Sequence, residues 1–130
     1  MSASTLRIGV LMPEVLGTYG DTGNALILAE RARRRGIEAE VVHVGLTEEI
    51  PDSLDIYTLG GGEDTAQALA ADKFRGTSGL SRALDAGRPL LAICASLQVL
   101  GHWYEDARGV RVPGMGVLDI TPEPQGHRAI

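Results

Sequence analysis

Short apolar runs separated by helical patterns are the feature of this sequence that most restricts its fold. Each run has the length of a strand, and the runs predict strands at residues 6–12, 38–44, 55–59, 89–93 and 117–121. Helices are predicted between them, over residues 25–35, 65–72, 78–86 and 95–104. Strands that alternate with helices form βαβ units, which build a parallel sheet covered by helices. The sequence therefore predicts an α/β fold, with one open, mostly parallel sheet and helices on both faces.

Charge and cysteine content exclude several classes of function. The net charge of −5 argues against a general nucleic-acid binder, which needs clustered cations. The basic cluster at residues 31–35 lies at a predicted helix end, where it complements the helix dipole. A single cysteine rules out an internal disulfide framework and fits a reducing compartment. The sequence also shows no signal-peptide pattern and no apolar run of transmembrane length, so a cytoplasmic protein is predicted.

The only cysteine, Cys94, lies where a predicted strand meets a predicted helix. The stretch R-P-L-L-A-I-C-A-S-L-Q-V-L-G at residues 88–101 has apolar residues before the thiol, then Leu97, Leu100 and Trp103 at helical spacing. A helix N-terminus favours the thiolate, which is the nucleophilic form. The N–H of Ala95 is then placed to stabilise an oxyanion. The alternative is a small, buried, apolar cysteine with no chemistry.

Two glycine-rich segments also follow predicted strands. In a parallel sheet, the carboxyl ends of the strands meet at one edge, where binding sites form. The loop Y-G-D-T-G-N at residues 19–24 is either a turn with an N-cap or a contact for substrate or partner. The triple glycine Gly60-Gly61-Gly62 either forms a plain tight turn or lets the backbone approach a substrate and supply an oxyanion N–H. Asp64 is placed to cap the helix that follows.

Other polar residues are weaker candidates. Gln98 lies one helical turn after the cysteine and is either a solvated side chain or part of a substrate pocket. Arg128 either pairs with a carboxylate or is a surface charge. A cysteine nucleophile usually needs a base, but His43, His102 and His127 do not have the expected placement, so no histidine is assigned. No metal ligands are predicted.

Four motifs in order carry a family resemblance. They are Y-G-D-T-G-N at residues 19–24, L-G-G-G-E-D at 59–64, L-A-I-C-A-S-L-Q-V-L-G at 91–101 and G-M-G-V-L-D at 114–119. Together they resemble class I glutamine amidotransferase domains of the cobyric acid synthase-like type, which have a flavodoxin-like fold. Within that family they are most similar to the small subunit of lipid II isoglutaminyl synthases. The family usually has glycines where this chain has Ala95 and Ser96, which is a mild departure.

The resemblance implies that residues 1–130 are the N-terminal major part of a single amidotransferase domain. In the family, the last strands of the fold and the general-base histidine lie beyond the position of Ile130. The chain is therefore expected to be either a fragment of a longer protein or a truncated domain with impaired catalysis. By this resemblance Cys94 attacks glutamine to form a thioester, and N–H groups of Ala95 and the Gly61–Gly62 turn hold the oxyanion. Arg128 and Gln98 would bind the substrate. The 130-residue chain alone is expected to be inactive.

The resemblance also implies a partner. Ammonia released from glutamine would pass to a Mur ligase-like subunit in a heterodimer, which would amidate the D-glutamate of lipid II to isoglutamine during peptidoglycan synthesis. No cofactor is expected in this subunit, because ATP and Mg²⁺ would bind the partner. Two alternatives stay open: the same chemistry with another acceptor, such as a corrinoid carboxylate, or a non-catalytic binding module of this fold.

Overall fold

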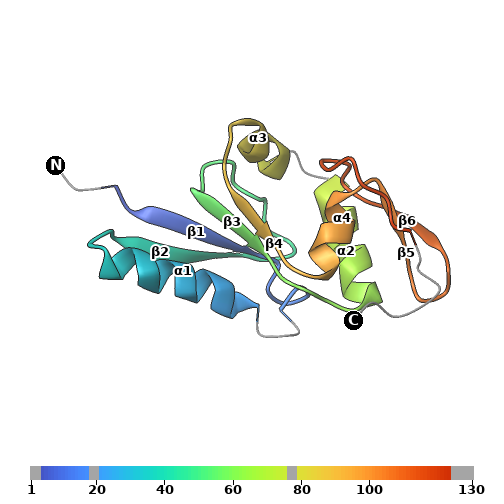
Figure 1. The fold of residues 1–130 in the computed structure, drawn as a ribbon, viewed down its shortest axis with the longest axis horizontal. Coiled ribbons are helices and arrows are strands. Elements are labelled where there is room, and N and C mark those ends of the chain that lie inside the picture. The colour runs from blue at the N-terminus through green and yellow to red at the C-terminus, as the bar shows by residue number, and fades with distance from the viewer. Residues whose placement is uncertain (1–3, 18–20, 76–78, 124–130) are drawn as a thin grey trace.

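A parallel sheet forms the centre of the protein (Figure 1). The computed structural model describes residues 4–17, 21–75 and 79–123. Four parallel strands lie in the order β2-β1-β3-β4. Their bounds are β1 (Leu6–Leu11), β2 (Ala39–Val44), β3 (Ile56–Leu59) and β4 (Leu90–Ala92). The predicted α/β fold is therefore confirmed.

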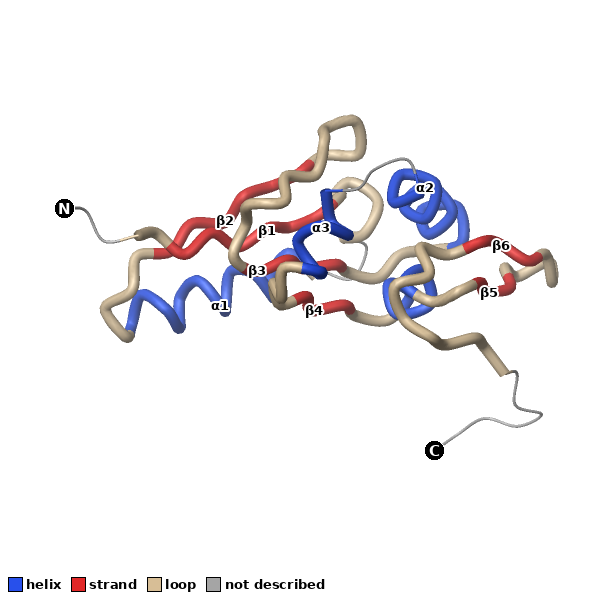
Figure 2. The backbone as a smooth tube through the Cα atoms, turned by 90° about the horizontal axis from the view of Figure 1, so that it is seen from above, coloured by secondary structure: helices blue, strands red, loops and turns tan. Residues whose placement is uncertain are grey.

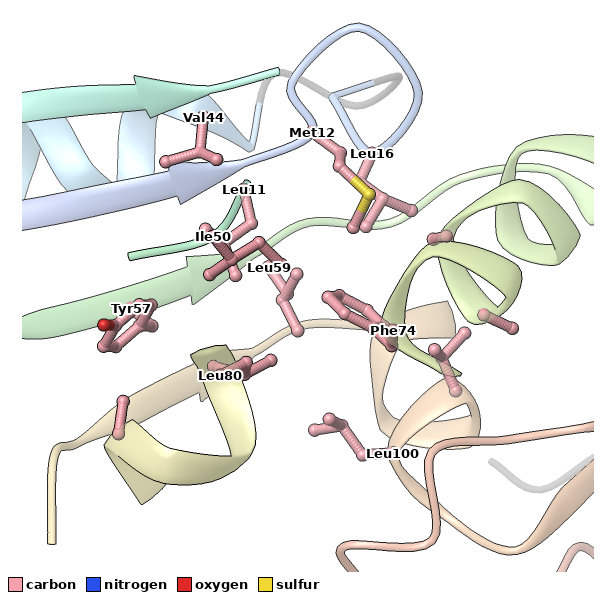
Figure 3. Close-up of a cluster of buried hydrophobic side chains, with 14 of the residues drawn as sticks. Leu11, Met12, Leu16, Val44, Ile50, Tyr57, Leu59, Phe74, Leu80 and Leu100 are labelled. Atoms are coloured by element: carbon pink, nitrogen blue, oxygen red, sulfur yellow. The ribbon is translucent and has the colours of Figure 1, made fainter. Parts of the chain in front are cut away.

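Helices cover both faces of this sheet. α1 (Thr22–Arg34) covers one face and α3 (Gly79–Asp85) lies on the other, while α2 (Asp64–Arg75) and α4 (Ala95–Leu100) lie past the ends of the strands. On one face, Ile8 and Val10 of β1 pack with alanines of α1. On the other face, Tyr57 of β3 belongs to the same buried cluster as Leu80 of α3 (Figure 3). None of the helices among the described residues is long and apolar enough to cross a membrane.

The larger core extends past the ends of the strands to α2 and α4. Figure 3 shows Leu59 at the end of β3 close to Phe74 of α2, with Leu100 of α4 beyond them. Phe74 and Leu100 are each only 2% exposed. Burying an apolar side chain of this size contributes about 1.5–3 kcal/mol. This packing fixes α4, and the cysteine before it, at the carboxyl edge of the sheet.

The buried face of α1 matches only part of the apolar pattern that predicts this helix, Leu26, Ile27, Ala29 and Ala32. Leu26 and Ile27 are 54% and 58% exposed. Ala29 and Ala32 face the sheet as predicted, together with Ala25. The small side chain of alanine lets a helix lie close to a sheet. Gly36 follows the helix with φ 77°, the conformation of a C′ glycine.

The basic residues at the end of α1 bind the protein's own groups. Arg33 donates to the carbonyl oxygen of Ala39 at 2.8 Å, and Arg34 pairs with Glu30 at 3.1 Å. They also occupy the last turn of the helix, where cations complement its dipole.

The region after α4 was predicted incorrectly. The helix predicted at residues 95–104 ends at Leu100. It is followed by an antiparallel hairpin of β5 (Trp103–Glu105) and β6 (Arg111–Pro113), for which no strands were predicted. The backbone becomes extended at Gly101 (φ −78°, ψ −168°), and the guanidinium of Arg111 stacks 3.6 Å from the ring centre of Trp103. Figure 2 shows this hairpin and α2 beyond the end of the sheet.

The strand predicted at residues 117–121 does not form. Instead, the N–H of Leu118 donates to the carbonyl oxygen of Leu100, and the N–H of His102 donates to that of Ile120, both at 3.0 Å. The last carbonyls of a helix lack intrahelical partners. Residues 117–121 are therefore bound to the end of α4. Their apolar sequence had predicted a strand of the sheet.

Candidate active site

Cys94 has a strained backbone and an exposed side chain. It links β4 to α4 with φ 57° and ψ −122°. L-residues rarely adopt such a conformation, which costs about 1–3 kcal/mol. A strained strand-to-helix turn that exposes a nucleophile is the geometry of a nucleophile elbow. The thiol is therefore not buried, contrary to the alternative of a small, buried cysteine, and its role as a nucleophile stays a prediction.

Ser96 ties this elbow to the glycine turn after β3. Its side chain is fully buried, and its hydroxyl donates to the carbonyl oxygen of Gly60. The sequence showed Ser96 only as a residue where the resembling family has glycine. The hydroxyl gives the departure a physical role, because it joins the turns after two neighbouring strands. Without this partner, a buried carbonyl oxygen would lose a hydrogen bond.

The glycine turn lies directly against the loop after β1. A Cβ atom on Gly60 would lie 2.1 Å from the carbonyl oxygen of Leu16, and one on Gly62 would lie 2.8 Å from that of Val15. Both distances are too short for any side chain. The glycines therefore allow close contact with the protein's own loop, and a role for this turn toward a substrate stays a prediction.

Asp21 holds the same turn through its side chain. It occupies the N-cap position of α1 but makes no side-chain capping bond. Its carboxylate instead accepts a hydrogen bond from the N–H of Gly61 at 2.8 Å. Within the described residues, the N–H groups of Gly62 and Ala95 have no hydrogen-bond partner. These two amides, rather than that of Gly61, are thus available to a ligand.

Gln98 is held by a residue that the sequence did not single out. The side-chain amide nitrogen of Gln67 in α2 lies 3.0 Å from Oε1 of Gln98 and 3.4 Å from the carbonyl oxygen of Ala95. Gln67 is only 4% exposed, whereas Gln98 is exposed. The sequence signal that could have identified Gln67 is its helical spacing from Ala70 and Phe74, which places it on the buried face of α2. A polar residue on an apolar helix face needs a partner.

Small hollows adjoin Gln98. One of about 160 Å³ and one of about 330 Å³ are both lined by Gln98, Trp103 and Pro122. Glu105, Asp106 and Glu123 complete the lining of the larger one. A separate, mostly apolar cavity of about 800 Å³ lies along β4 and contains none of these residues. The hollows beside Gln98 border a polar side chain of the predicted site, which makes them the candidates for substrate binding.

Asp64 does not act as the predicted N-cap. It is the first residue of α2, and its carboxylate accepts a hydrogen bond from the N–H of Ala107 at 2.7 Å. It therefore anchors the loop of the β5–β6 hairpin beside α2.

The remaining candidates lie away from this cluster or outside the described residues. His43 is exposed on β2, and His102 lies past the end of α4 opposite to Cys94, with Nε2 2.8 Å from Asp119. Arg128 and His127 fall outside the described residues, as do residues 19 and 20 of the first glycine-rich loop. Over residues 4–17, 21–75 and 79–123, no group of three or more His, Cys, Asp or Glu side chains could hold a metal ion.

Comparison with known proteins gives one family. A profile of the CobB/CobQ-like glutamine amidotransferase domain matches residues 7–130. The chain is 38% identical to the lipid II isoglutaminyl synthase (glutamine-hydrolyzing) subunit GatD of Staphylococcus aureus over 125 residues, which are 95% of this chain and 51% of that protein. The subunit of the same name from Streptococcus pneumoniae is 34% identical over 115 residues, 87% of this chain and 44% of that protein.

A relative with a different name is also similar. The pyridoxal 5'-phosphate synthase subunit PdxT of Haloarcula marismortui is 34% identical over 119 residues, 92% of this chain and 56% of that protein. The chain thus spans about half the length of the curated relatives it matches.

Proposed function

Because this chain belongs to the CobB/CobQ-like glutamine amidotransferase family, we propose that it carries the nucleophile of a glutamine-hydrolysing subunit. The observation that carries this proposal is the conformation of Cys94, which is strained and exposed at the start of α4. Strain of this kind persists only where surrounding contacts enforce it, and it gathers at active sites. The buried bond from Ser96 to Gly60 is such a contact.

The chemistry proposed for this thiol is acyl transfer. The Sγ atom of Cys94 attacks the side-chain carboxamide of glutamine, and the carbonyl oxygen gains negative charge. The N–H groups of Ala95 and Gly62 donate to that oxyanion, while Gly61 supports the turn through its bond to Asp21. The carbon–nitrogen bond then breaks, and the thiol proton reaches the departing nitrogen through a base. Ammonia and a glutamyl thioester form, and water releases glutamate.

Substrate binding is assigned to Gln98 and Arg128. Gln98 borders the hollows beside α4, and its amide can hydrogen-bond to the substrate. Arg128 supplies a guanidinium for the α-carboxylate of glutamine, which such a group binds with two parallel hydrogen bonds. The general base is a histidine outside residues 1–130, so this chain alone does not hydrolyse glutamine.

We further propose that the ammonia serves lipid II amidation. Two relatives with 34–38% identity are named as subunits of lipid II isoglutaminyl synthase, which supports this acceptor. The partner is then a Mur ligase-like subunit that binds ATP and Mg²⁺ and converts the D-glutamate of lipid II to isoglutamine in the cytoplasm. The subunit proposed here needs no cofactor of its own.

The test of this acceptor uses the complete gene product with its candidate ligase partner. Lipid II, ATP, Mg²⁺ and ¹⁵N-amide-labelled glutamine are supplied, and mass spectrometry follows the label. The proposal expects ¹⁵N in lipid II only when ATP and both subunits are present. Glutamine hydrolysis without label in lipid II would refute this acceptor while leaving the amidotransferase chemistry in place.

A second candidate is the same chemistry for another acceptor, which the 34% identity to a pyridoxal 5'-phosphate synthase subunit favours. A corrinoid carboxylate is a further acceptor of this type. Labelling with the glutamine analogue diazo-oxo-norleucine separates both acceptors from a non-catalytic binding module. A working glutaminase is alkylated selectively at Cys94, and added glutamine protects it, whereas an inert module shows neither effect.

A further inference from the structure

We propose that Gln67 is a positioning residue for glutamine, because it fixes which end of the Gln98 side-chain amide faces the substrate. This inference rests on the proposed function. It concerns a buried residue of α2 that reaches the elbow only through α4.

The first step is the burial of Gln67. Its side chain is 4% exposed and shares a helix face with Ala70 and Phe74. Burying a primary amide costs free energy unless its hydrogens find partners. The amide nitrogen carries two hydrogens, and it has two acceptors in α4, Oε1 of Gln98 at 3.0 Å and the carbonyl oxygen of Ala95 at 3.4 Å. Gln67 is thus a clamp between two helices.

The second step is the effect on Gln98. A glutamine side chain has one acceptor oxygen and one donor NH₂ group, and rotation by 180° exchanges them. Gln67 donates, so it holds the oxygen of Gln98 and leaves its NH₂ group free. Gln98 borders the two hollows that also contain Trp103 and Pro122. The clamp therefore makes Gln98 a hydrogen-bond donor toward an acceptor oxygen of the bound glutamine.

The variant that removes the clamp is Gln67→Met. Methionine has nearly the same length and stays buried but donates no hydrogen bond. Without Gln67, the amide of Gln98 rotates, and substrate binding must select the productive orientation. The KM for glutamine is expected to rise roughly five- to tenfold, the effect of about one neutral hydrogen bond. The kcat is expected to stay within about twofold, since the bond from Ser96 to Gly60 still holds the elbow.

A double-mutant cycle with Gln98→Met decides whether Gln67 acts through Gln98. If it does, the double variant has the same KM as Gln98→Met alone, because the clamp has nothing left to position. A merely structural role for Gln67 predicts additive effects instead. Thr58→Val is the matched control: Thr58 is also buried and polar, but its hydroxyl binds Gly9 within the sheet at 2.7 Å. This control is expected to lower the melting temperature without raising KM.

The assay is steady-state glutamine hydrolysis by the complete gene product with its partner. Alkylation of Cys94 by iodoacetamide, which needs no glutamine pocket, is expected at the wild-type rate in Gln67→Met. An unchanged KM or additive effects in the cycle would overturn the inference. If Gln67→Met does not fold, Gln67→Asn is used in its place. The asparagine side chain is too short to reach Gln98, so the same rise in the KM for glutamine is expected. A wild-type protein without Cys94-dependent hydrolysis would instead overturn the proposed function.

Discussion

Replacing Cys94 with glycine is expected to stabilise the protein relative to replacement with alanine. This order is opposite to the usual one. Glycine normally destabilises a folded chain by about 0.5–1 kcal/mol relative to alanine, because its unfolded state has more conformational freedom. At Cys94, however, φ is 57° and ψ is −122°, a backbone conformation that penalises any residue with a Cβ atom.

The magnitude follows from two opposing terms. Relief of backbone strain raises the free energy of unfolding of the glycine variant by about 1–3 kcal/mol. The greater conformational entropy of glycine in the unfolded chain lowers it by about 0.5–1 kcal/mol. Loss of side-chain packing is small and nearly equal in the two variants, because the side chain of Cys94 is exposed. Cys94→Gly is therefore expected to be about 1 kcal/mol more stable than Cys94→Ala.

Urea denaturation of the complete gene product measures this difference. Both variants lack the thiol, so both are expected to be inactive in glutamine hydrolysis, and a loss of activity with a gain in stability would show that strain serves the site. If Cys94→Gly unfolds at the same or a lower urea concentration than Cys94→Ala, the backbone at this position is not strained, and the elbow argument is refuted.

Other substitutions test the contacts around the elbow and the core by urea denaturation. Gly60→Ala places a Cβ 2.1 Å from a backbone oxygen and is expected to cost at least about 3 kcal/mol, whereas Gly23→Ala, with no atom within 4 Å, is expected to be neutral or slightly stabilising. Ser96→Ala leaves a buried carbonyl oxygen without its hydroxyl partner and is expected to cost about 1–3 kcal/mol; a neutral result would contradict the bridge between the two turns. Burial raises the pKa of Tyr104, so the stability held by its neutral phenol is present below about pH 10 and is lost as the pH rises through the raised pKa. Tyr104→Phe is expected to reduce that alkaline loss at little cost at pH 7, because this hydroxyl has no partner in the described part of the chain. Tyr57→Phe loses a bond to a backbone carbonyl and is expected to cost about 1 kcal/mol at pH 7; equal effects of the two tyrosine changes would contradict this difference.

Sequence patterns predicted the sheet because they depend on local periodicity. Four of the five predicted strands form, and each lies within one residue of its predicted bounds. The ends of α1 and α3 could also be predicted from the sequence, because a glycine follows each helix. Gly36 and Gly87 have the positive φ of a C′ residue. The position of Cys94 between a strand and a helix followed from the same local signals.

Contacts between residues far apart in the sequence could not be predicted from local patterns. The fifth predicted strand failed because Leu118 binds the end of α4, a partner that strand periodicity cannot reveal. Asp21 and Asp64 sit at helix starts, but their carboxylates bind N–H groups about 40 residues away. The contact of Gln67 with Gln98 depends on two helices meeting, so in the sequence Gln67 is only a polar residue on an apolar helix face.

Glutamate release from glutamine by the complete gene product with its partner subunit tests whether Cys94 is the nucleophile. Wild type is compared with Cys94→Ser, in which an oxygen replaces the reactive sulfur and the backbone conformation can be kept. Wild type is expected to release glutamate, and the variant is expected to lose at least about a hundredfold in kcat, the scale of losing a nucleophile. Glutamate release by Cys94→Ser at the wild-type rate would contradict the assignment of Cys94 as the nucleophile.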